Sequence, residues 1–206
     1  MKTKFFIILT LIAIFATACF DFSGKEIRRC DFTEAQDMVV PYEKGQVISF
    51  IYDKGQVIDL IVTEIEQQWN QYGVDGGMIE DYITYKFKQI ELKSDVNNME
   101  IIFNVTAVGC LSGEGENCEI KIFLNPYKGY FMFDSDKDGN FMFFSSFHDS
   151  IEINSKVYCN VGEAKFNRDV LDSTSPPFQE MQLFYNKEYG ILQINRDSEN
   201  FLTLKN

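Results

Sequence analysis

The fold is decided by one stretch of the chain, Gln46–Thr63, which reads QVISFIYDKGQVIDLIVT. Apolar and polar residues alternate through Ile48–Tyr52 and again through Ile58–Val62, as they do in strands with one buried face. Between these two runs, Asp53–Gly55 has the composition of a tight turn. The stretch therefore predicts an antiparallel β-hairpin.

The same kind of pattern continues along most of the chain, with short strand-like segments separated by turn residues. Further strands are predicted over residues 82–92, 99–107, 120–124, 129–133, 141–144, 151–153 and 157–161, and a C-terminal meander over 181–185, 191–195 and 201–204. About ten short strands with hardly any helical period predict an all-β protein. We expect an antiparallel β-sandwich or an open β-barrel with little helix.

Three segments depart from this simple alternation. A change of phase inside residues 82–92 predicts a β-bulge near Lys88 and Gln89. Residues 67–78 are polar and rich in glycine, which predicts a loop that holds Trp69, the only tryptophan. We expect this indole to fold back as a lid on the core, the alternative being that it stacks on a sugar or a partner. Residues 167–179 are typical of a linker or a long loop.

Two aromatic runs, Tyr130–Phe133 and Phe141–Phe144, do not alternate. Strands of this kind are buried on both faces, and that is the arrangement we expect here. The alternative is that one face lines a cavity for an apolar ligand, which would make the protein a carrier.

The N-terminus has the order of segments that a secretory signal requires. Lys2 and Lys4 form a basic head, Phe5–Phe15 is apolar except for Thr10, and small residues follow directly before Cys19. The apolar run is too short to span a bilayer. Residues 1–18 are therefore predicted to be a signal peptide.

Ala16-Thr17-Ala18-Cys19 resembles the lipobox of bacterial lipoproteins, in which the cysteine is acylated and becomes the mature N-terminus. The segments Pro41–Gln46 and Phe184–Leu192 are also similar to small lipoproteins of Bacteroidetes-type bacteria, a group of largely unknown function. The resemblance implies acylation of Cys19, a lipid anchor in the cell envelope, most simply in the outer membrane, and a β-rich domain. The alternative is an ordinary signal-peptidase site that leaves Cys19 unmodified.

The mature chain is expected to have two parts. Residues 19–40 comprise the acylated cysteine and a tether, in which Thr33 and Gln36 form a capping-box pattern for a short helix before Pro41. Residues 41–206 form a single β-rich domain. Whether the anchored protein faces the periplasm or the cell surface stays open.

The cysteine count suits an exported protein. Setting Cys19 aside leaves an even number, Cys30, Cys110, Cys118 and Cys159. Cys110 and Cys118 flank a short glycine-containing loop between two strands, so we predict a disulfide between them. Cys30 is predicted to pair with Cys159, the alternative being two separate thiols.

The formal net charge is −12, which disfavours nucleic acid as a partner. Catalysis is also not expected. The only histidine, His148, lies in Ser145–Ser150, where we expect a turn with an exposed imidazole and no spatial triad. None of the cysteine and histidine spacings fits zinc.

Asp134–Asn140 is the sharpest motif in the chain. Asp134, Asp136, Asp138 and Asn140 match part of a calcium-binding loop, with Gly139 where such a loop turns. Ser145 stands where that loop needs a bidentate glutamate, so we favour a hairpin turn over a calcium site and expect no other cofactor.

The expected function is that of a lipid-anchored, non-enzymatic envelope protein with a binding or structural role. One alternative is a carrier or binding lipoprotein for an apolar ligand or a glycan. The other is a hydrolase with a carboxylate pair, since acidic residues are abundant and their pairing in space cannot be read from the sequence. Any protein or glycan partner stays unknown at this level.

Overall fold

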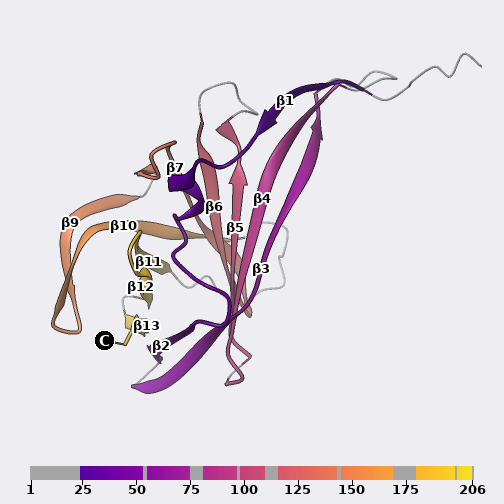
Figure 1. Ribbon diagram of the computed structural model, residues 1–206. Coiled ribbons are helices and arrows are strands. Elements are labelled where there is room, and N and C mark those ends of the chain that lie inside the picture. The colour runs from indigo at the N-terminus through magenta and orange to yellow at the C-terminus, as the bar shows by residue number, and fades with distance from the viewer. Residues whose placement is uncertain are drawn as a thin grey trace, which may run out of the picture.

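The computed structural model describes residues 24–52, 55–74, 81–96, 98–109, 116–142, 145–168, 180–197 and 199–205. Within these ranges the protein is almost entirely β-sheet (Figure 1). The elements are β1 (Glu26–Cys30), α2 (Glu34–Asp37), β2 (Val47–Tyr52), β3 (Gln56–Gly73), β4 (Tyr82–Lys93), β5 (Glu100–Ala107), β6 (Cys118–Asn125), β7 (Tyr127–Ser135), β8 (Phe141–Met142), β9 (Ser146–Ile153), β10 (Lys156–Arg168), β11 (Met181–Asn186), β12 (Gly190–Arg196) and β13 (Glu199–Leu204). No helix in this part of the chain is long and apolar enough to cross a membrane.

Ten antiparallel strands close into a barrel. The strands follow one another in the order β7-β6-β5-β4-β3-β2-β13-β12-β11-β10, and the end of β10 pairs back onto β7, with Phe166 opposite Phe131. The predicted all-β class and the antiparallel pairing are confirmed. Of the two expected architectures, a sandwich and an open barrel, the fold is a barrel, and it is closed. Closure depends on the length of β10, whose first part pairs with β9 and whose end reaches β7.

The barrel interior is filled with side chains. In β5, Ile101, Phe103 and Val105 are buried, while the residues between them are half-buried on the outer face. Buried and half-buried residues alternate in the same way along β6. Burial of each large apolar side chain stabilises the fold by about 1.5–3 kcal/mol, so this continuous cluster is the main source of stability.

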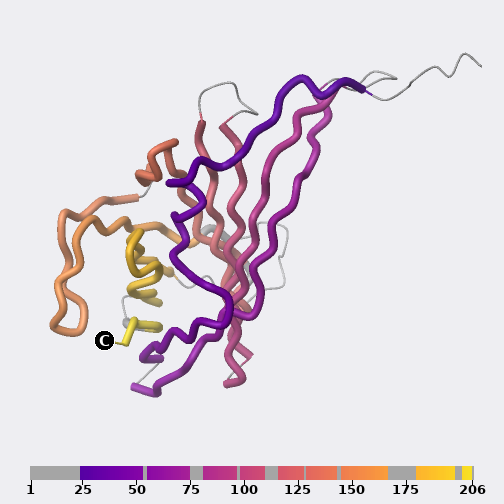
Figure 2. Tube along the Cα trace, viewed as in Figure 1, coloured from indigo at the N-terminus to yellow at the C-terminus, as the bar shows by residue number. Residues whose placement is uncertain are grey.

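The segment between β1 and β2 packs inside this core. Val39, Val40 and Tyr42 are buried in the same cluster as residues of β5 and β12, and Figure 2 shows the trace running between the two sides of the barrel. The Tyr42 hydroxyl accepts a hydrogen bond from the Ile191 N–H at 2.8 Å, and the Tyr185 hydroxyl donates to the Val39 carbonyl at 2.7 Å. The interior is thus occupied by the protein itself.

This packing corrects the predicted division of the chain at residue 40. The short helix is confirmed, with the Thr33–Gln36 capping box in place. Its described residues outside the helix also belong to the fold, because β1 pairs in parallel with β4 and Val39 and Val40 are core residues. Cys19 and the signal segment lie outside the described residues.

The long hairpin of β3 and β4 also differs from expectation. Trp69 belongs to β3, which continues to Gly73, so the loop predicted from residue 67 begins later. The bulge lies in β3, between Val62 and Glu64, and not near Lys88 in β4. The phase change in β4 arises because Ile83 packs in a separate small cluster with Cys30.

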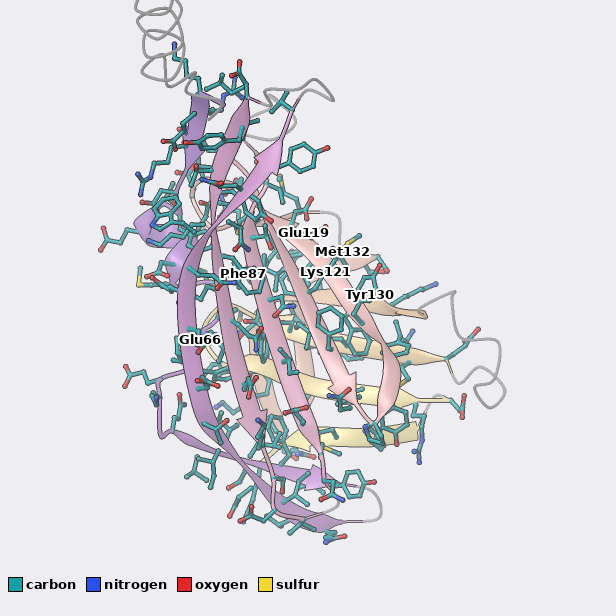
Figure 3. All side chains as sticks on the ribbon, turned by 90° about the vertical axis from the view of Figure 1, so that its right-hand side faces the viewer. Glu66, Phe87, Glu119, Lys121, Tyr130 and Met132 are labelled. Carbon is teal, nitrogen blue, oxygen red and sulfur yellow. The ribbon has the colours of Figure 1, made fainter. Side chains whose placement is uncertain are left out.

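Strand β7 is buried on one face only, which corrects the prediction for Tyr130–Phe133. Phe131 and Phe133 point into the core, where Phe131 packs against Phe166 with ring centroids 5.1 Å apart. Figure 3 shows Tyr130 and Met132 on the outer side of the sheet, and Met132 is 40% exposed. The inner aromatic side chains of this strand therefore fill the core and do not line a ligand cavity.

The β9–β10 hairpin forms a second, smaller core outside the barrel. Tyr158 and Val161 pack there with Phe184 and Leu192. Asn160 has a left-handed backbone with φ of 54°, which breaks the alternation of β10 and turns Tyr158 and Val161 to the same cluster. The predicted C-terminal meander, β11–β12–β13, is confirmed.

Candidate functional site

A pocket of about 380 Å³ lies where four segments distant in sequence meet. Its walls come from the β7–β8 turn, β9, β10 and the β11–β12 turn. The lining side chains are two aromatic rings, three amides, a thiol, an ammonium group and a carboxylate, from Phe141, Phe147, Asn140, Asn160, Asn186, Cys159, Lys187 and Glu188. Pockets for small ligands combine apolar walls with a few fixed polar groups in this way.

The β7–β8 turn forms one wall and is held by Asp136. One Asp136 carboxylate oxygen accepts hydrogen bonds from the N–H groups of Asp138 at 2.9 Å and Asn140 at 2.8 Å, and the other accepts from the Asn140 side chain. Burial alone would raise the pKa of Asp136, but these hydrogen bonds bring it below its ordinary value. The turn therefore holds its shape through an ionised carboxylate.

Asp134–Asn140, the partial match to a calcium-binding loop, spans the end of β7 and this turn. β7 and β8 pair across the turn, with Ser135 opposite Phe141, so the favoured hairpin turn is confirmed. Asp134 lies in β7 opposite Glu119, and burial followed by the charge of Glu119 raises its pKa. Among the described residues, no three acidic, cysteine or histidine side chains gather where a metal ion would bind. Asp134 thus lies in strand β7, outside the turn that Asp136 holds together.

The β11–β12 turn forms the opposite wall. The Asn186 side chain accepts a hydrogen bond from the Tyr189 N–H at 2.8 Å and donates to the Cys159 carbonyl at 3.2 Å, which ties the turn to β10. The Lys187 ammonium donates to the Asp138 carbonyl at 3.5 Å, the upper limit for such a bond. Two turns and one strand are thus joined around the pocket, which makes its walls a connected unit.

The side chains that line the pocket differ in their exposure to solvent. Phe147 is 54% exposed, so its ring is available to a ligand. Phe141 is half-buried, and its ring packs edge-on against Tyr185 in the core. Asn140, Asn160 and Glu188 are exposed. The pocket therefore offers an aromatic surface bordered by hydrogen-bond donors and acceptors.

The cysteines correct the predicted disulfides. Cys118 and Cys159 are free thiols, so neither the Cys110–Cys118 nor the Cys30–Cys159 bridge is formed. Cys118 is buried in β6, and its sulfur is 3.1 Å from the Ser135 hydroxyl. Cys159 is exposed because it lies on the opposite face of β10 from the buried Tyr158. Cys30 is buried and disulfide-bonded, and Cys110 lies outside the described residues.

The two free thiols are expected to differ strongly in reactivity. Burial raises the pKa of the Cys118 thiol to about 11, the hydrogen bond with Ser135 opposing this in part, so the reactive thiolate is scarce at neutral pH. Alkylation of the native protein at pH 7.5 should modify Cys159 more than about a hundredfold faster than Cys118. Mass spectrometry of the time course measures both rates. Equal rates would contradict the burial of Cys118.

His148 lies within strand β9, which corrects the expected turn, and it is paired with an acid. Its Nε2 atom is 3.1 Å from a Glu163 carboxylate oxygen, and the other oxygen of Glu163 accepts from Gln182 at 3.2 Å. Because neighbouring strand residues point to opposite faces, Asp149 is directed away from His148. Ser, His and Asp of this segment therefore do not form a triad.

No protein family, curated protein or solved structure matches this chain. The pocket geometry is therefore the main guide to function. Sequence reasoning singled out one wall of the pocket, the Asp134–Asn140 turn, and missed Phe147, Asn160 and Lys187. For the opposite wall, the sequence indicated only a turn over residues 186–190. No sequence pattern indicated that these two turns lie side by side.

Proposed function

We propose that the protein is a non-enzymatic binding protein of the cell envelope, lipid-anchored at Cys19, and that its pocket binds a saccharide. The observation that supports this proposal is the pocket lining, in which the exposed Phe147 ring is bordered by Asn140, Asn160, Lys187 and Glu188. Sugars present an apolar face of C–H groups and a polar edge of hydroxyls, so they suit an aromatic ring bordered by donors and acceptors.

A glycan fits better than an apolar ligand. A carrier of apolar molecules needs a dry interior cavity, whereas the barrel interior is packed with aromatic side chains and with Val39, Val40 and Tyr42. Tyr185 is in contact with Phe133 and Phe141, with ring centroids 5.2 and 5.5 Å away. The remaining pocket opens at the surface and carries polar side chains, which favours a ligand that is itself polar.

The hydrolase alternative finds less support in the same pocket. Glycoside hydrolysis uses two carboxyl groups on either side of the scissile bond. Glu188 is the one carboxylate among the described residues that line the pocket. Glu163 accepts one hydrogen bond from Gln182 and is paired with His148, and it does not line the pocket. We therefore propose binding without turnover.

Pocket substitutions test the proposal. The purified protein is screened against bacterial and host glycans on an array, and hits are measured by calorimetry. Phe147→Ala should weaken binding of a hit by about tenfold or more, equivalent to about 1.4 kcal/mol, because the stacking surface is lost. Val157→Ala is the matched control, since Val157 is 60% exposed on the same hairpin and lies outside the pocket. Equal affinities of the two variants, or no glycan bound, would contradict saccharide binding here.

Membrane anchoring is tested separately. Cys19→Ala should move the protein from the membrane fraction to the soluble fraction, because two or more acyl chains are needed for stable attachment and the variant has none. Fractionation with immunoblotting measures this, and mass spectrometry of the wild type should find the lipid on Cys19. A variant that sediments with membranes as fully as the wild type would rule out this anchor.

A further inference from the structure

We propose that the arm formed by β1 and the outer ends of β3 and β4 lies against the membrane surface, an inference that rests on the proposed lipid anchor at Cys19. Figure 1 shows these three strands extending together beyond the ends of β5 and β6. In the arm, β4 lies between β3 and β1, with Gly73 opposite Tyr82 on one side and Glu26 opposite Tyr82 on the other. Those residues define the arm tip.

Exposed apolar and aromatic side chains gather at the arm tip. Tyr72 is 57% exposed, Ile27 49% and Val74 43%, and Trp69 lies further back on β3 at 38%. Tryptophan and tyrosine favour the boundary between water and lipid, because their rings are apolar and carry a polar group. The side chains of the arm tip therefore suit a bilayer surface better than bulk water.

The arm carries exposed cations near its tip. Lys25, Arg28 and Arg29 are exposed along the start of the arm, where Glu26, Asp31 and Asp81 are the acidic residues that the structure describes. Lys25, Arg28 and Arg29 are the charge complement of lipid phosphates, in a chain whose formal net charge is −12. Repulsion between the acidic barrel and anionic lipids would at the same time favour contact through the arm alone.

The position of the anchor brings this arm to the bilayer. Glu26, the first residue of β1, is the seventh residue after Cys19. Even a fully extended chain of that length spans about 25 Å at most. Because Glu26 lies at the arm tip, acyl chains on Cys19 would hold this end of the molecule within that distance of the lipid. No other described part of the fold is tied so closely to the anchor.

Side-chain contacts also hold the three strands of the arm together. The Arg29 guanidinium lies 4.0 Å from the centre of the Trp69 ring, and the Lys86 ammonium lies 2.9 Å from Asp31. These contacts join β1, β3 and β4 on one face. The β9–β10 hairpin lies on the opposite side of the barrel from the arm tip (Figure 1). Contact through the arm would therefore leave the hairpin, and the pocket wall that it forms, facing away from the bilayer.

Tryptophan fluorescence tests the contact, because Trp69 is the only tryptophan of the chain. The full-length lipidated protein is reconstituted in vesicles of phosphatidylethanolamine and phosphatidylglycerol that contain a headgroup spin-labelled lipid. Two relocated probes are compared with it, Trp69→Phe/Tyr72→Trp at the arm tip and Trp69→Phe/Val157→Trp on the β9–β10 hairpin. We expect several-fold stronger quenching of the probe at position 72 than of the probe at position 157, with native Trp69 between them.

The outcomes separate the arm contact from the anchor. Protein that floats with the vesicles and shows equal quenching at positions 72 and 157 would overturn the arm contact and leave the anchor intact. Protein that does not float would overturn both. Iodide quenching of native Trp69 needs no substitution and gives a second test: reconstitution should reduce it, and unchanged access of iodide to Trp69 would contradict the contact.

Discussion

Gly190→Ala is expected to lower the free energy of unfolding by about 3 kcal/mol, the sum of backbone strain and overpacking. Gly190 has a left-handed backbone with φ of 76°, and a Cβ atom placed on it would lie 2.2 Å from the Tyr42 hydroxyl oxygen. That ring cannot move aside at little cost, because Tyr42 is 5% exposed and its hydroxyl accepts a hydrogen bond from Ile191.

Gly45→Ala is the matched control. Gly45 has a similar backbone, with φ of 84°, but a Cβ atom there has no neighbour within 4 Å. This substitution should cost only the backbone strain, about 1 kcal/mol. Urea unfolding of both variants separates the two contributions. Equal losses would show that the segment before β2 is not packed against the β11–β12 turn as described.

Cys30→Ala is expected to lower the free energy of unfolding by about 4 kcal/mol, because the substitution removes a disulfide that closes a long loop. Cys30 is buried and disulfide-bonded, whereas Cys118 and Cys159 are free. Since Cys19 is proposed to carry the lipid, we expect Cys110 to be the partner. Ala107, three residues earlier in the chain than Cys110, packs in the same small cluster as Cys30.

Two measurements check this pairing. Non-reducing peptide mapping should recover a Cys30 peptide linked to a Cys110 peptide, and urea unfolding should show the loss in Cys30→Ala. Cys159→Ala is the control and should change stability by less than about 0.5 kcal/mol, because its thiol is exposed and unpaired. A Cys30 peptide linked to Cys19 would contradict both the pairing and the lipid anchor.

The strands of the barrel could be predicted from the sequence because each has one face in the core. Alternation through Ile48–Tyr52 and Ile58–Val62 led directly to the β2–β3 hairpin. The arm could not be predicted in this way, because the residues of β3 beyond Glu66 are largely exposed on both faces. Their sequence therefore has no alternation of apolar and polar residues. β1 has one buried residue, Cys30, so it resembled a tether.

Other differences came from single backbone positions and from pairing at a distance. Cys159 and Val161 would share one face of a regular strand, but with the left-handed Asn160 between them Cys159 is exposed and Val161 is buried. Closure of the barrel depends on Phe166 meeting Phe131, a contact that no local pattern contains. The pocket could not be predicted either, because its walls come from residues that are distant in sequence, 139–141, 147, 159–160 and 186–188.

Saccharide binding in this pocket is tested most directly by nuclear magnetic resonance of the ¹⁵N-labelled protein titrated with a glycan that binds. We expect the largest amide shift changes at Asn140, Phe147, Asn160 and Lys187, with the outer face around Tyr130 and Lys121 unchanged. Shift changes centred on Tyr130 and Lys121, with the pocket amides unmoved, would contradict saccharide binding in this pocket.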